Sequence, residues 1–303
     1  MFDIINVVLP LFIIIALGAT LRAIKVVDEK WIEVLNKYEL FIGFPALILY
    51  NVMNVDAQQF IGWNIVFYNF ALLFGIIGLT YLVTSLLKLE KSLRNSYVIC
   101  IFFGNTAYLG IPIITSLVKD SGGSVAIHVA IYILVLFTLG IAILESTMKK
   151  RKGVLEIVKN VFRSPLFLSA LIGILLFFLQ IKPPEVIHKT LQLIANTSAP
   201  VALLALGMFI YRKIEFNKET MHSVILATLK LLIVPAVFVT IASIFSLTGK
   251  FNISIMEAAM PIAVTPFALS QIYPLNKNVL SLAILISTIF TIVTVPLLFT
   301  IIK

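Results

Sequence analysis

Charged residues are scarce in this sequence. Asp, Glu, Lys and Arg make up 12% of the 303 residues, 60% are hydrophobic, and the mean hydropathy is +1.09. A water-soluble protein of this length needs far more polar surface than so few charges can supply. The composition therefore excludes an ordinary soluble globular protein and indicates a chain that is solvated by lipid.

Cysteine and the common catalytic motifs are also nearly absent. Cys100 is the single cysteine, which excludes a disulfide within the chain, and neither Cys100 nor His128 has metal-ligand spacing. We interpret both as packing residues. No phosphate-binding Walker loop, zinc-protease helix or nucleophile elbow is found. The sequence thus predicts no enzyme, no metal centre and no organic cofactor.

Long apolar segments are what the sequence has in abundance. A membrane-spanning helix needs about 20 apolar residues, and the segments that approach this length predict an all-α polytopic membrane protein. Within them, Gly75 and Gly78 are expected to allow close helix contacts. The ten predicted spans are 4–21, 38–54, 63–87, 95–118, 124–146, 164–181, 187–211, 222–247, 253–273 and 278–302.

Basic residues predict the orientation of these spans. Of the 23 Lys and Arg residues, 17 fall on the side of the connection between spans 1 and 2, and this side should be cytoplasmic. We therefore expect a multi-pass protein of the cell membrane, inner or plasma, with both termini outside and no signal peptide. The net charge of +9 then reflects topology and contact with anionic lipid headgroups rather than nucleic-acid binding.

The two halves of the chain repeat one pattern. Pro10-Leu11-Phe12 recurs 155 residues later as Pro165-Leu166-Phe167, and Pro45 recurs as Pro200. Because each half has five predicted spans, the second half must enter the membrane from the opposite side, and the repeat is inverted. The expected domains are a first five-helix repeat (1–146), a basic cytoplasmic connection (147–163) and a second repeat (164–303).

One span in each half is interrupted near its middle. Gly110 and Pro112 weaken span 4, and Pro261 and Pro266 weaken span 9. Interrupted helices at matched places in inverted repeats indicate the binding site of a transporter; the alternative is a pair of kinked helices satisfied by their neighbours. The predicted substrate-binding residues are Asn105, Thr106, Tyr108, Gly110, Pro112, Pro261, Thr265 and Pro266.

Four short motifs stand at the two interruptions: Asn105-Thr106, Gly110-Ile111-Pro112, Ala259-Met260-Pro261 and Val264-Thr265-Pro266-Phe267. Together they resemble the auxin efflux carrier family, which includes plant auxin carriers and bacterial relatives described as malate or malonate permeases. The likeness runs over essentially the whole chain. One departure is that this chain lacks the long cytoplasmic loop of the large plant carriers, so control by phosphorylation of such a loop is not expected.

The resemblance implies a fold. It implies ten spans as two inverted five-helix repeats with broken crossover helices 4 and 9, as in bile acid:sodium symporters. It further implies a scaffold of spans 1, 2, 6 and 7, a transport domain of spans 3–5 and 8–10, and an elevator-like motion of one against the other. Pro112 and Pro266 become the crossing prolines, and Asn105 belongs to the substrate region.

Two ionisable residues within spans need an explanation, because such groups are costly in a membrane. Glu257 is interpreted as an interfacial residue in contact with water. The alternative hypothesis, by resemblance to the bile acid symporters, is that Glu257 with Asn105 nearby binds a coupling ion, either Na⁺ or a proton. We expect Lys230 to snorkel towards the cytoplasmic headgroups, the alternative being a charge partner or a substrate-steering group.

The predicted function is secondary transport of small organic anions, such as carboxylates, by alternating access. Half-helix N-termini that converge at the membrane midplane favour an anion, and neither interruption contains an Asp that a strong cation exporter would use. Two alternatives stay open, a sodium-coupled symporter of bulkier organic acids and a membrane sensor that binds an organic acid without moving it. The expected partners are the substrate anion and the lipid bilayer, with a homodimer left open.

Overall fold

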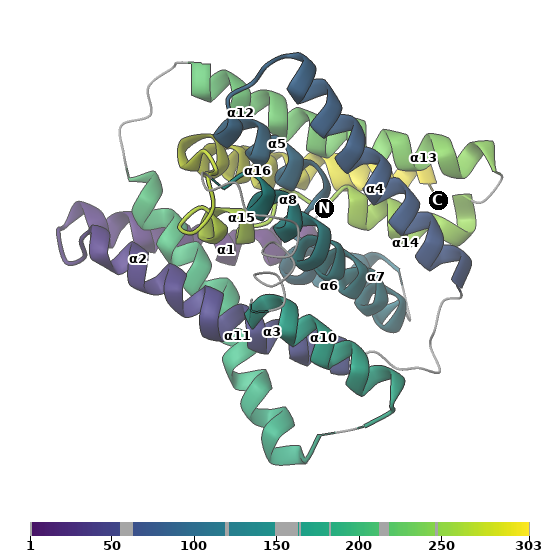
Figure 1. Cartoon of the computed structure of the whole chain (residues 1–303), viewed down its shortest axis with the longest axis horizontal. Helices are drawn as coiled ribbons and strands as arrows, with labels where there is room; N and C mark the ends of the chain where they lie inside the picture. Colours follow the sequence, from purple (N-terminus) through teal and green to yellow (C-terminus); the bar gives the residue numbers. More distant parts are fainter. Residues whose placement is uncertain are drawn as a thin grey trace.

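The computed structural model describes residues 2–54, 63–118, 121–148, 163, 165–181, 183–211, 218–245 and 248–302, and these form helices joined by short connections (Figure 1). The basic run at 149–152 lies outside the described residues. Several helices are continued by π-helical segments, which are labelled η. The elements of the first half are α1 (Phe2–Ala23), α2 (Glu29–Tyr38), η1 (Glu39–Gly43), α3 (Phe44–Met53), α4 (Trp63–Leu86), α5 (Lys91–Phe102), η3 (Thr106–Gly110), α6 (Ile111–Leu117), α7 (Gly122–Val135), η4 (Leu136–Gly140) and α8 (Ile141–Ser146).

The second half is also built of helices, one of them continued by a π-helical segment. Residues 259–264 and 270–276 lie between its last three helices, and the last helix runs without interruption to Ile302. The elements are α10 (Pro165–Phe178), α11 (Glu185–Ile210), α12 (Lys218–Thr228), η5 (Leu229–Ile233), α13 (Val234–Ile244), α14 (Thr248–Ala258), α15 (Thr265–Leu269) and α16 (Lys277–Ile302).

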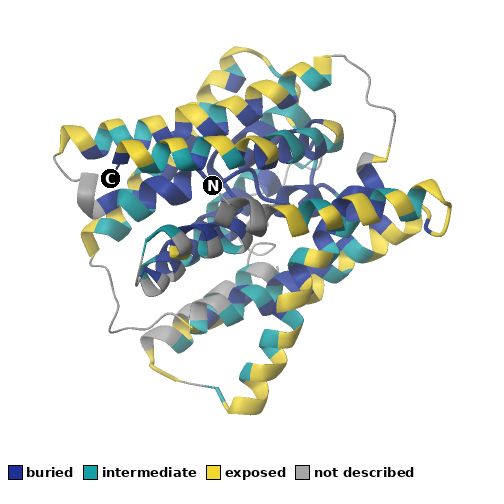
Figure 2. Ribbon diagram, turned by 180° about the vertical axis from the view of Figure 1, so that it is seen from behind, coloured by how far each residue is buried: buried dark blue, intermediate teal, exposed yellow. Residues whose placement is uncertain are grey.

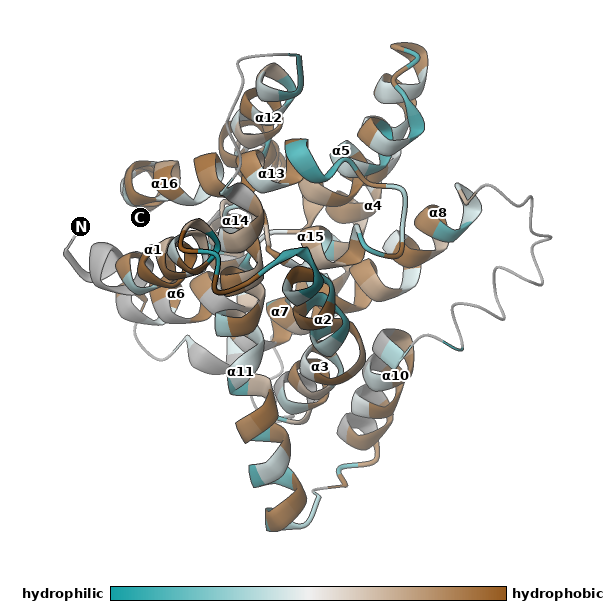
Figure 3. Ribbon diagram, turned by 90° about the vertical axis from the view of Figure 1, so that its left-hand side faces the viewer, coloured by the Kyte–Doolittle hydropathy of each residue, from teal (hydrophilic) through white to brown (hydrophobic). Residues whose placement is uncertain are grey.

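Five helical stretches in the described part are long and apolar enough to cross a membrane. They agree with a polytopic membrane protein, since an apolar helix of this length can span the hydrocarbon core of a bilayer. Apolar residues dominate these helices, whereas hydrophilic residues gather in connections and along α2 (Figure 3). The five stretches are Trp63–Leu86, Ile127–Ser146, Glu185–Phe209, Lys218–Ile244 and Lys277–Ile302.

Burial separates inner from outer helices. The side chains of α5, α14 and α15 are largely buried, and they form the centre of the molecule (Figure 2). Helix α4 lies outside, with large apolar side chains such as Phe67, Leu79 and Leu86 more than half exposed. In water such a surface would aggregate, so it faces lipid, and the interrupted segments are shielded behind it.

Helices α1 and α11 approach each other at two glycines. A Cβ atom on Gly18 would collide with the backbone carbonyl of Leu204, and one on Gly207 would collide with that of Ile15. The expectation that Gly75 and Gly78 provide close helix contacts is wrong within this chain, because a Cβ at either position meets nothing within 4 Å. Small residues therefore allow close packing between α1 and α11 and not along α4.

The π-helical segments are unusual. Each adds one residue to a helical turn, and such segments are rare and frequently found at functional sites. Among the described elements η1 begins with Glu39, η3 spans Thr106–Gly110 and η5 contains Lys230. Three of these segments therefore carry an acid, a set of predicted site residues and a buried lysine.

We predict that Gly207→Val destabilises the protein, because the new side chain must displace the Ile15 backbone. Overpacking of this kind costs at least about 1–3 kcal/mol. Gly75→Val is the matched control, since the space around that position is open. Thermal unfolding in detergent should give a lower melting temperature for Gly207→Val alone, and equal melting temperatures would contradict the close approach of α1 and α11.

Candidate functional site

The two interrupted helices meet at their interruptions. Helix α5 ends at Phe102, α14 ends at Ala258, and beyond them Gly104 and Ile262 form an antiparallel bridge. The Asn105 N–H donates to the Pro261 carbonyl over 2.6 Å, and the Ala263 N–H donates to the Phe103 carbonyl over 3.3 Å. Each break therefore satisfies the backbone groups that the other leaves free, as a membrane interior requires.

Two prolines lie at the start of the α-helices that follow the breaks. Pro266 lies in the first turn of α15, where a proline is tolerated because the first N–H groups of a helix have no intrahelical acceptor. Pro112 lies in the first turn of α6, directly after η3. Pro261 differs, since it lies between helices and contributes its carbonyl to the pairing.

A small cavity lies beside the paired segments. Its volume is about 30 Å³, which is room for a water molecule or two. The polar residues Asn105, Thr106 and Thr265 line it, and each of them is at least nine-tenths buried. The opposite wall is formed by Phe44, Leu47 and Ile48 of α3, and the remaining lining residues are Phe103, Gly104, Ala107, Ile133, Phe137, Ala263 and Val264.

The structure divides the predicted substrate-binding residues into groups. Asn105, Thr106 and Thr265 share the cavity, whereas Pro261 has a backbone role. Gly110 is not among the cavity residues and instead lies against Glu257. Tyr108 lies in η3 and Pro112 in α6, with side chains outside the described part of the structure.

Lys230 holds the ends of both helices that lead into the breaks. Its Nζ donates to the Ala258 carbonyl over 3.1 Å and to the Phe102 carbonyl over 3.4 Å. These are the last residues of α14 and α5, where each helix dipole places about half a negative charge. One ammonium can therefore neutralise two helix C-termini.

This placement corrects the expectation that Lys230 snorkels to the headgroups. The side chain is fully buried and points inward. A Cβ on Gly104 would lie 3.2 Å from Nζ, so the glycine leaves the ammonium its place. The lysine side chain is long enough to reach the surface. Its ammonium is instead held inside the protein by hydrogen bonds to two carbonyls at helix C-termini.

Glu257 lies on the last turn of α14 and is fully buried. The interpretation of an interfacial residue in contact with water is therefore wrong. Neither carboxylate oxygen has a hydrogen-bond partner among the described residues. A Cβ on Gly110 would lie 2.7 Å from Oε2. Lys230 acts on Glu257 electrostatically, yet no ion pair joins the two in the described part of the chain.

Sequence reasoning missed the polar neighbours of Glu257. His128 is buried as expected, but it is also hydrogen-bonded: Nδ1 must donate to the Ser124 carbonyl at 2.7 Å, so in neutral His128 Nε2 accepts from Ser254 Oγ at 2.7 Å. Asn69 Nδ2 donates to the same Ser254 oxygen over 2.8 Å. Ser254 precedes Glu257 by one helical turn.

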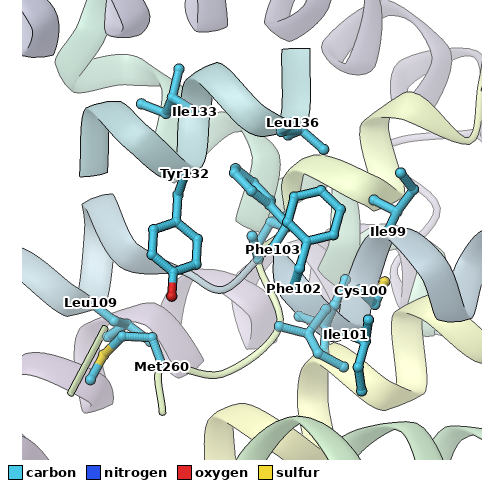
Figure 4. Close-up of a cluster of buried hydrophobic side chains, with 14 of the residues drawn as sticks. Ile99, Cys100, Ile101, Phe102, Phe103, Leu109, Tyr132, Ile133, Leu136 and Met260 are labelled. Carbon is cyan, nitrogen blue, oxygen red and sulfur yellow. The ribbon is translucent and has the colours of Figure 1, made fainter. Parts of the chain in front are cut away.

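Tyr132 extends this polar group. It follows His128 by one turn of α7, is fully buried, and its hydroxyl has no partner among the described residues. Figure 4 shows its ring pointing from α7 towards the segment that carries Met260. The spacing of His128 and Tyr132, and of Ser254 and Glu257, places each pair on one helix face. This spacing of polar residues is the feature of the sequence from which the buried polar group could have been predicted.

A larger cavity of about 320 Å³ lies elsewhere, between α4, α5 and the helix formed by α12, η5 and α13. Its walls are almost wholly apolar. Its polar residues include Tyr97 and His222, and the Tyr97 hydroxyl lies 3.0 Å from His222 Nδ1. A small charged molecule would lose its hydration there without gaining hydrogen bonds. The small cavity at the breaks, which has Asn105, Thr106 and Thr265 in its lining, is therefore the candidate site.

We predict that Lys230→Met lowers stability, because two helix C-termini lose their donor. A buried hydrogen bond from a charged group contributes about 1.5–3 kcal/mol, so the melting temperature in detergent should fall clearly. The exposed Lys218 at the start of the same helix provides the matched control, Lys218→Met, which should melt like the wild type. A Lys230→Met protein as stable as this control would contradict the proposed role of the ammonium.

Comparison with known proteins agrees with a membrane carrier. A family model described as membrane transport protein matches residues 3–299. An uncharacterized transporter of Methanocaldococcus jannaschii is 23% identical over 303 residues, covering 96% of this chain and 96% of the relative. A protein of Rhizobium meliloti named "Putative malonate transporter" is 25% identical over 317 residues, covering 97% and 94%.

Plant proteins match a shorter part of the chain. Auxin efflux carrier component 8 of Arabidopsis thaliana is 26% identical over 113 residues, which cover 37% of this chain and 31% of the relative. The family and its relatives are transporters and not enzymes. With crossed, interrupted helices at its centre, the chain belongs to the membrane transport protein family, which includes the auxin efflux carriers.

Proposed function

We propose that this protein is a secondary transporter of small organic anions such as carboxylates, and that it works by elevator-type alternating access. The observation that carries the proposal is the small cavity at the paired breaks, whose lining includes three buried polar side chains, in a chain of a transporter family. The cavity is lined on one side by the breaks and on the other by α3. A motion of one side against the other would therefore open or close it.

The proposed architecture is ten spans in two inverted five-helix repeats. Gly43 and Ser198 are counterparts at the repeat spacing of 155, and they are in contact, since a Cβ on Gly43 would lie 2.6 Å from Ser198 Oγ. Two symmetry-related residues can touch only near the axis that relates them. This contact supports a pseudo-two-fold axis between the helix that contains η1 and α11.

Contacts between helices support the division into scaffold and transport domain. Helices α1, α3, α10 and α11 correspond to spans 1, 2, 6 and 7, and extensive contacts join α1 to α11, α11 to α3 and α3 to α10. A second set of contacts joins α4 to α5, α12 to α16, and α13 and α7 to α14. Under the proposed orientation, both termini lie outside the cell membrane and the basic side faces the cytoplasm.

An anionic substrate is supported by the charge balance at the breaks. The helix formed by η3 and α6 begins beside the cavity, and its N-cap residue Asn105 makes no capping bond through its side chain. Its first N–H groups therefore remain available, and this helix end favours an anion by up to about 2 kcal/mol. Lys230 meanwhile neutralises the two nearby helix C-termini, so the local field stays positive. The name of the Rhizobium meliloti relative, a malonate transporter, agrees with a carboxylate.

Substrate binding requires a wider cavity. A dicarboxylate cannot enter about 30 Å³, so the described conformation is closed around the site. Thr106 and Thr265 lie on the two broken helices, whereas Phe44 lies on α3. Separation of α3 from the breaks would enlarge the cavity without breaking the backbone pairing.

Glu257 is the proposed coupling residue. A buried carboxylate without a hydrogen bond or an ion pair is costly, so in this conformation it must carry a proton or a bound cation. Gly110 lies against the carboxyl, Tyr132 lies within electrostatic reach of it, and Ser254 is one turn earlier on the same helix. A proton or Na⁺ that neutralises Glu257 would be released when the site opens, which couples the ion to the substrate.

We predict saturable uptake of radiolabelled malate, malonate or indole acetate into proteoliposomes of the purified protein. A proton or sodium gradient should drive the uptake. Asn105→Ala should reduce the rate of uptake by about tenfold or more, because a polar side chain of the cavity lining is lost. Uptake that persists in Asn105→Ala would place the substrate elsewhere. Binding without uptake would indicate a sensor.

We predict that Glu257→Gln abolishes gradient-driven accumulation but keeps exchange of external for internal substrate. Glutamine preserves the shape of the acid and cannot take up a proton or neutralise a cation. Glu33→Gln is the control, since Glu33 is exposed and paired only with Lys37 on the surface. Unchanged accumulation and unchanged ion dependence in Glu257→Gln would remove this residue from the coupling mechanism.

A further inference from the structure

A second buried acid lies away from the breaks. Glu39 is the first residue of η1, and its side chain is fully buried together with those of Asn36 and Ser198. All side-chain nitrogen and oxygen atoms of these three residues lack a hydrogen-bond partner within the described structure. Such a concentration of unsatisfied buried polar atoms is rare in folded proteins and requires an explanation.

Two of these side chains, Glu39 and Ser198, meet at one glycine. A Cβ on Gly43 would lie 2.6 Å from Ser198 Oγ and 2.7 Å from Glu39 Oε2. Asn36 precedes Glu39 by three residues and therefore occupies the same face of the helix. The Ser198 hydroxyl is close enough to act on the Glu39 carboxyl, although the two make no well-formed hydrogen bond. The glycine thus leaves space for a small polar cluster between two helices.

The cluster lies deep in the molecule. Residues 29–53 form one continuous helix through α2, η1 and α3, and Glu39 is near its middle. Ser198 is near the middle of α11. At 1.5 Å per residue, Glu39 lies about 15 Å and Ser198 about 18 Å from the nearer end of its helix. Lys37 and Thr197 next to the cluster are exposed, so it is the packing around the fully buried side chain that keeps water from the Glu39 carboxyl.

Within the part of the chain that the structure describes, no cation pairs with Glu39. On its own helix, the exposed Lys37 pairs with Glu33 over 2.7 Å. Helices α3, α10 and α15, which also contact this region, contain no Lys, Arg, His, Asp or Glu, and the titratable residue of α3 is Tyr50. The titratable residues of α11 lie in its first two turns: Glu185, His188 and Lys189.

We propose that Glu39, Asn36 and Ser198 form a proton-binding site, and that the Glu39 carboxyl carries a proton in the closed conformation. An ionised carboxylate without water, cation or hydrogen bonds is far less stable than the neutral acid. Three side chains supply too few oxygen atoms to replace the hydration shell of a metal cation, whereas a proton needs only the carboxyl. This assignment concerns a residue outside the coupling site at Glu257.

The position of the site links it to transport. The carbonyl of Glu39 accepts the Phe44 N–H, and Phe44 lines the cavity. Segment η1 also contacts α15, which carries Thr265 on the opposite side of that cavity. Resting on the proposed function, the proton on Glu39 would be exposed to water when α15 moves away from η1. One titratable carboxyl would then lie on each side of the moving interface.

The first test is chemical labelling of the full-length protein in lipid nanodiscs. Dicyclohexylcarbodiimide is apolar, and its central carbon is attacked by a carboxyl oxygen while the carboxyl proton passes to its nitrogen, so it labels protonated acids. Exposed carboxyls with a pKa of about 4.3 are almost fully ionised at pH 7. Mass spectrometry should find labelling at Glu39 at least about tenfold above the matched exposed residue Glu33 of the same helix.

Labelling at different pH values and in Na⁺ or K⁺ buffers distinguishes a bound proton from a bound sodium ion. Labelling at Glu39 should fall at alkaline pH and be equal in Na⁺ and K⁺ buffers. Protection by Na⁺ alone would overturn the proton site in favour of a sodium site. Infrared spectra provide the second measurement: the carbonyl band of a protonated carboxyl should be present in the wild type and weaker in Glu39→Gln. Labelling of Glu39 no higher than that of Glu33, together with an identical carbonyl band in both proteins, would overturn the proposal.

The outcome is separable from that of the transport assay. Labelled Glu39 in a protein without uptake would leave the proton site standing and refute the proposed function. Uptake by a protein in which Glu39 is ionised would support the proposed function and refute the proton site. If both hold, Glu39→Gln should flatten the pH dependence of uptake, whereas Glu33→Gln should leave it unchanged.

Discussion

The structure depends on the backbone pairing between the two broken helices. Inside a membrane every backbone polar group needs a partner, and a helix that stops at Phe102 or Ala258 leaves several carbonyls and N–H groups without one. The Gly104–Ile262 bridge satisfies some of these groups. Lys230 satisfies the two carbonyl ends. Because neither break could exist alone in lipid, each half of the chain requires the other.

This mutual requirement explains why the breaks, but not their surroundings, could be predicted from sequence. Pro261 and Pro266 act on the backbone locally, so their effect can be recognised without a fold. The role of Lys230 depends on two carbonyls that lie far away in sequence, and the length of its side chain pointed to the surface instead. The burial of Glu257 could not be predicted for the same reason, since it results from elements distant in sequence that pack against α14, among them η3 with Gly110, α7, α13 and α16.

Glu39 shows where sequence reasoning stops. It lies at the start of a predicted span, beside the exposed Lys37, and such residues are usually solvated. Its burial arises from α11, where Ser198 faces it, and from η1, which no pattern in the sequence announces. The periodicity of apolar residues predicts that helices exist, but the choice of which polar side chain turns inward is made by packing.

The π-helical segments offer a physical reason for that choice. An α-helix advances 100° per residue, so one additional residue in a turn rotates everything after it by about that angle relative to an uninterrupted helix. An apolar stripe can then face lipid before and after the segment while one residue within it points to the interior. Glu39 in η1 and Lys230 in η5 both occupy such positions. An ionisable side chain is thereby buried in a spanning helix without facing lipid. Both residues also lie in segments whose backbone hydrogen bonds are already irregular. A change of protonation or conformation there breaks fewer regular backbone bonds than it would within an α-helix.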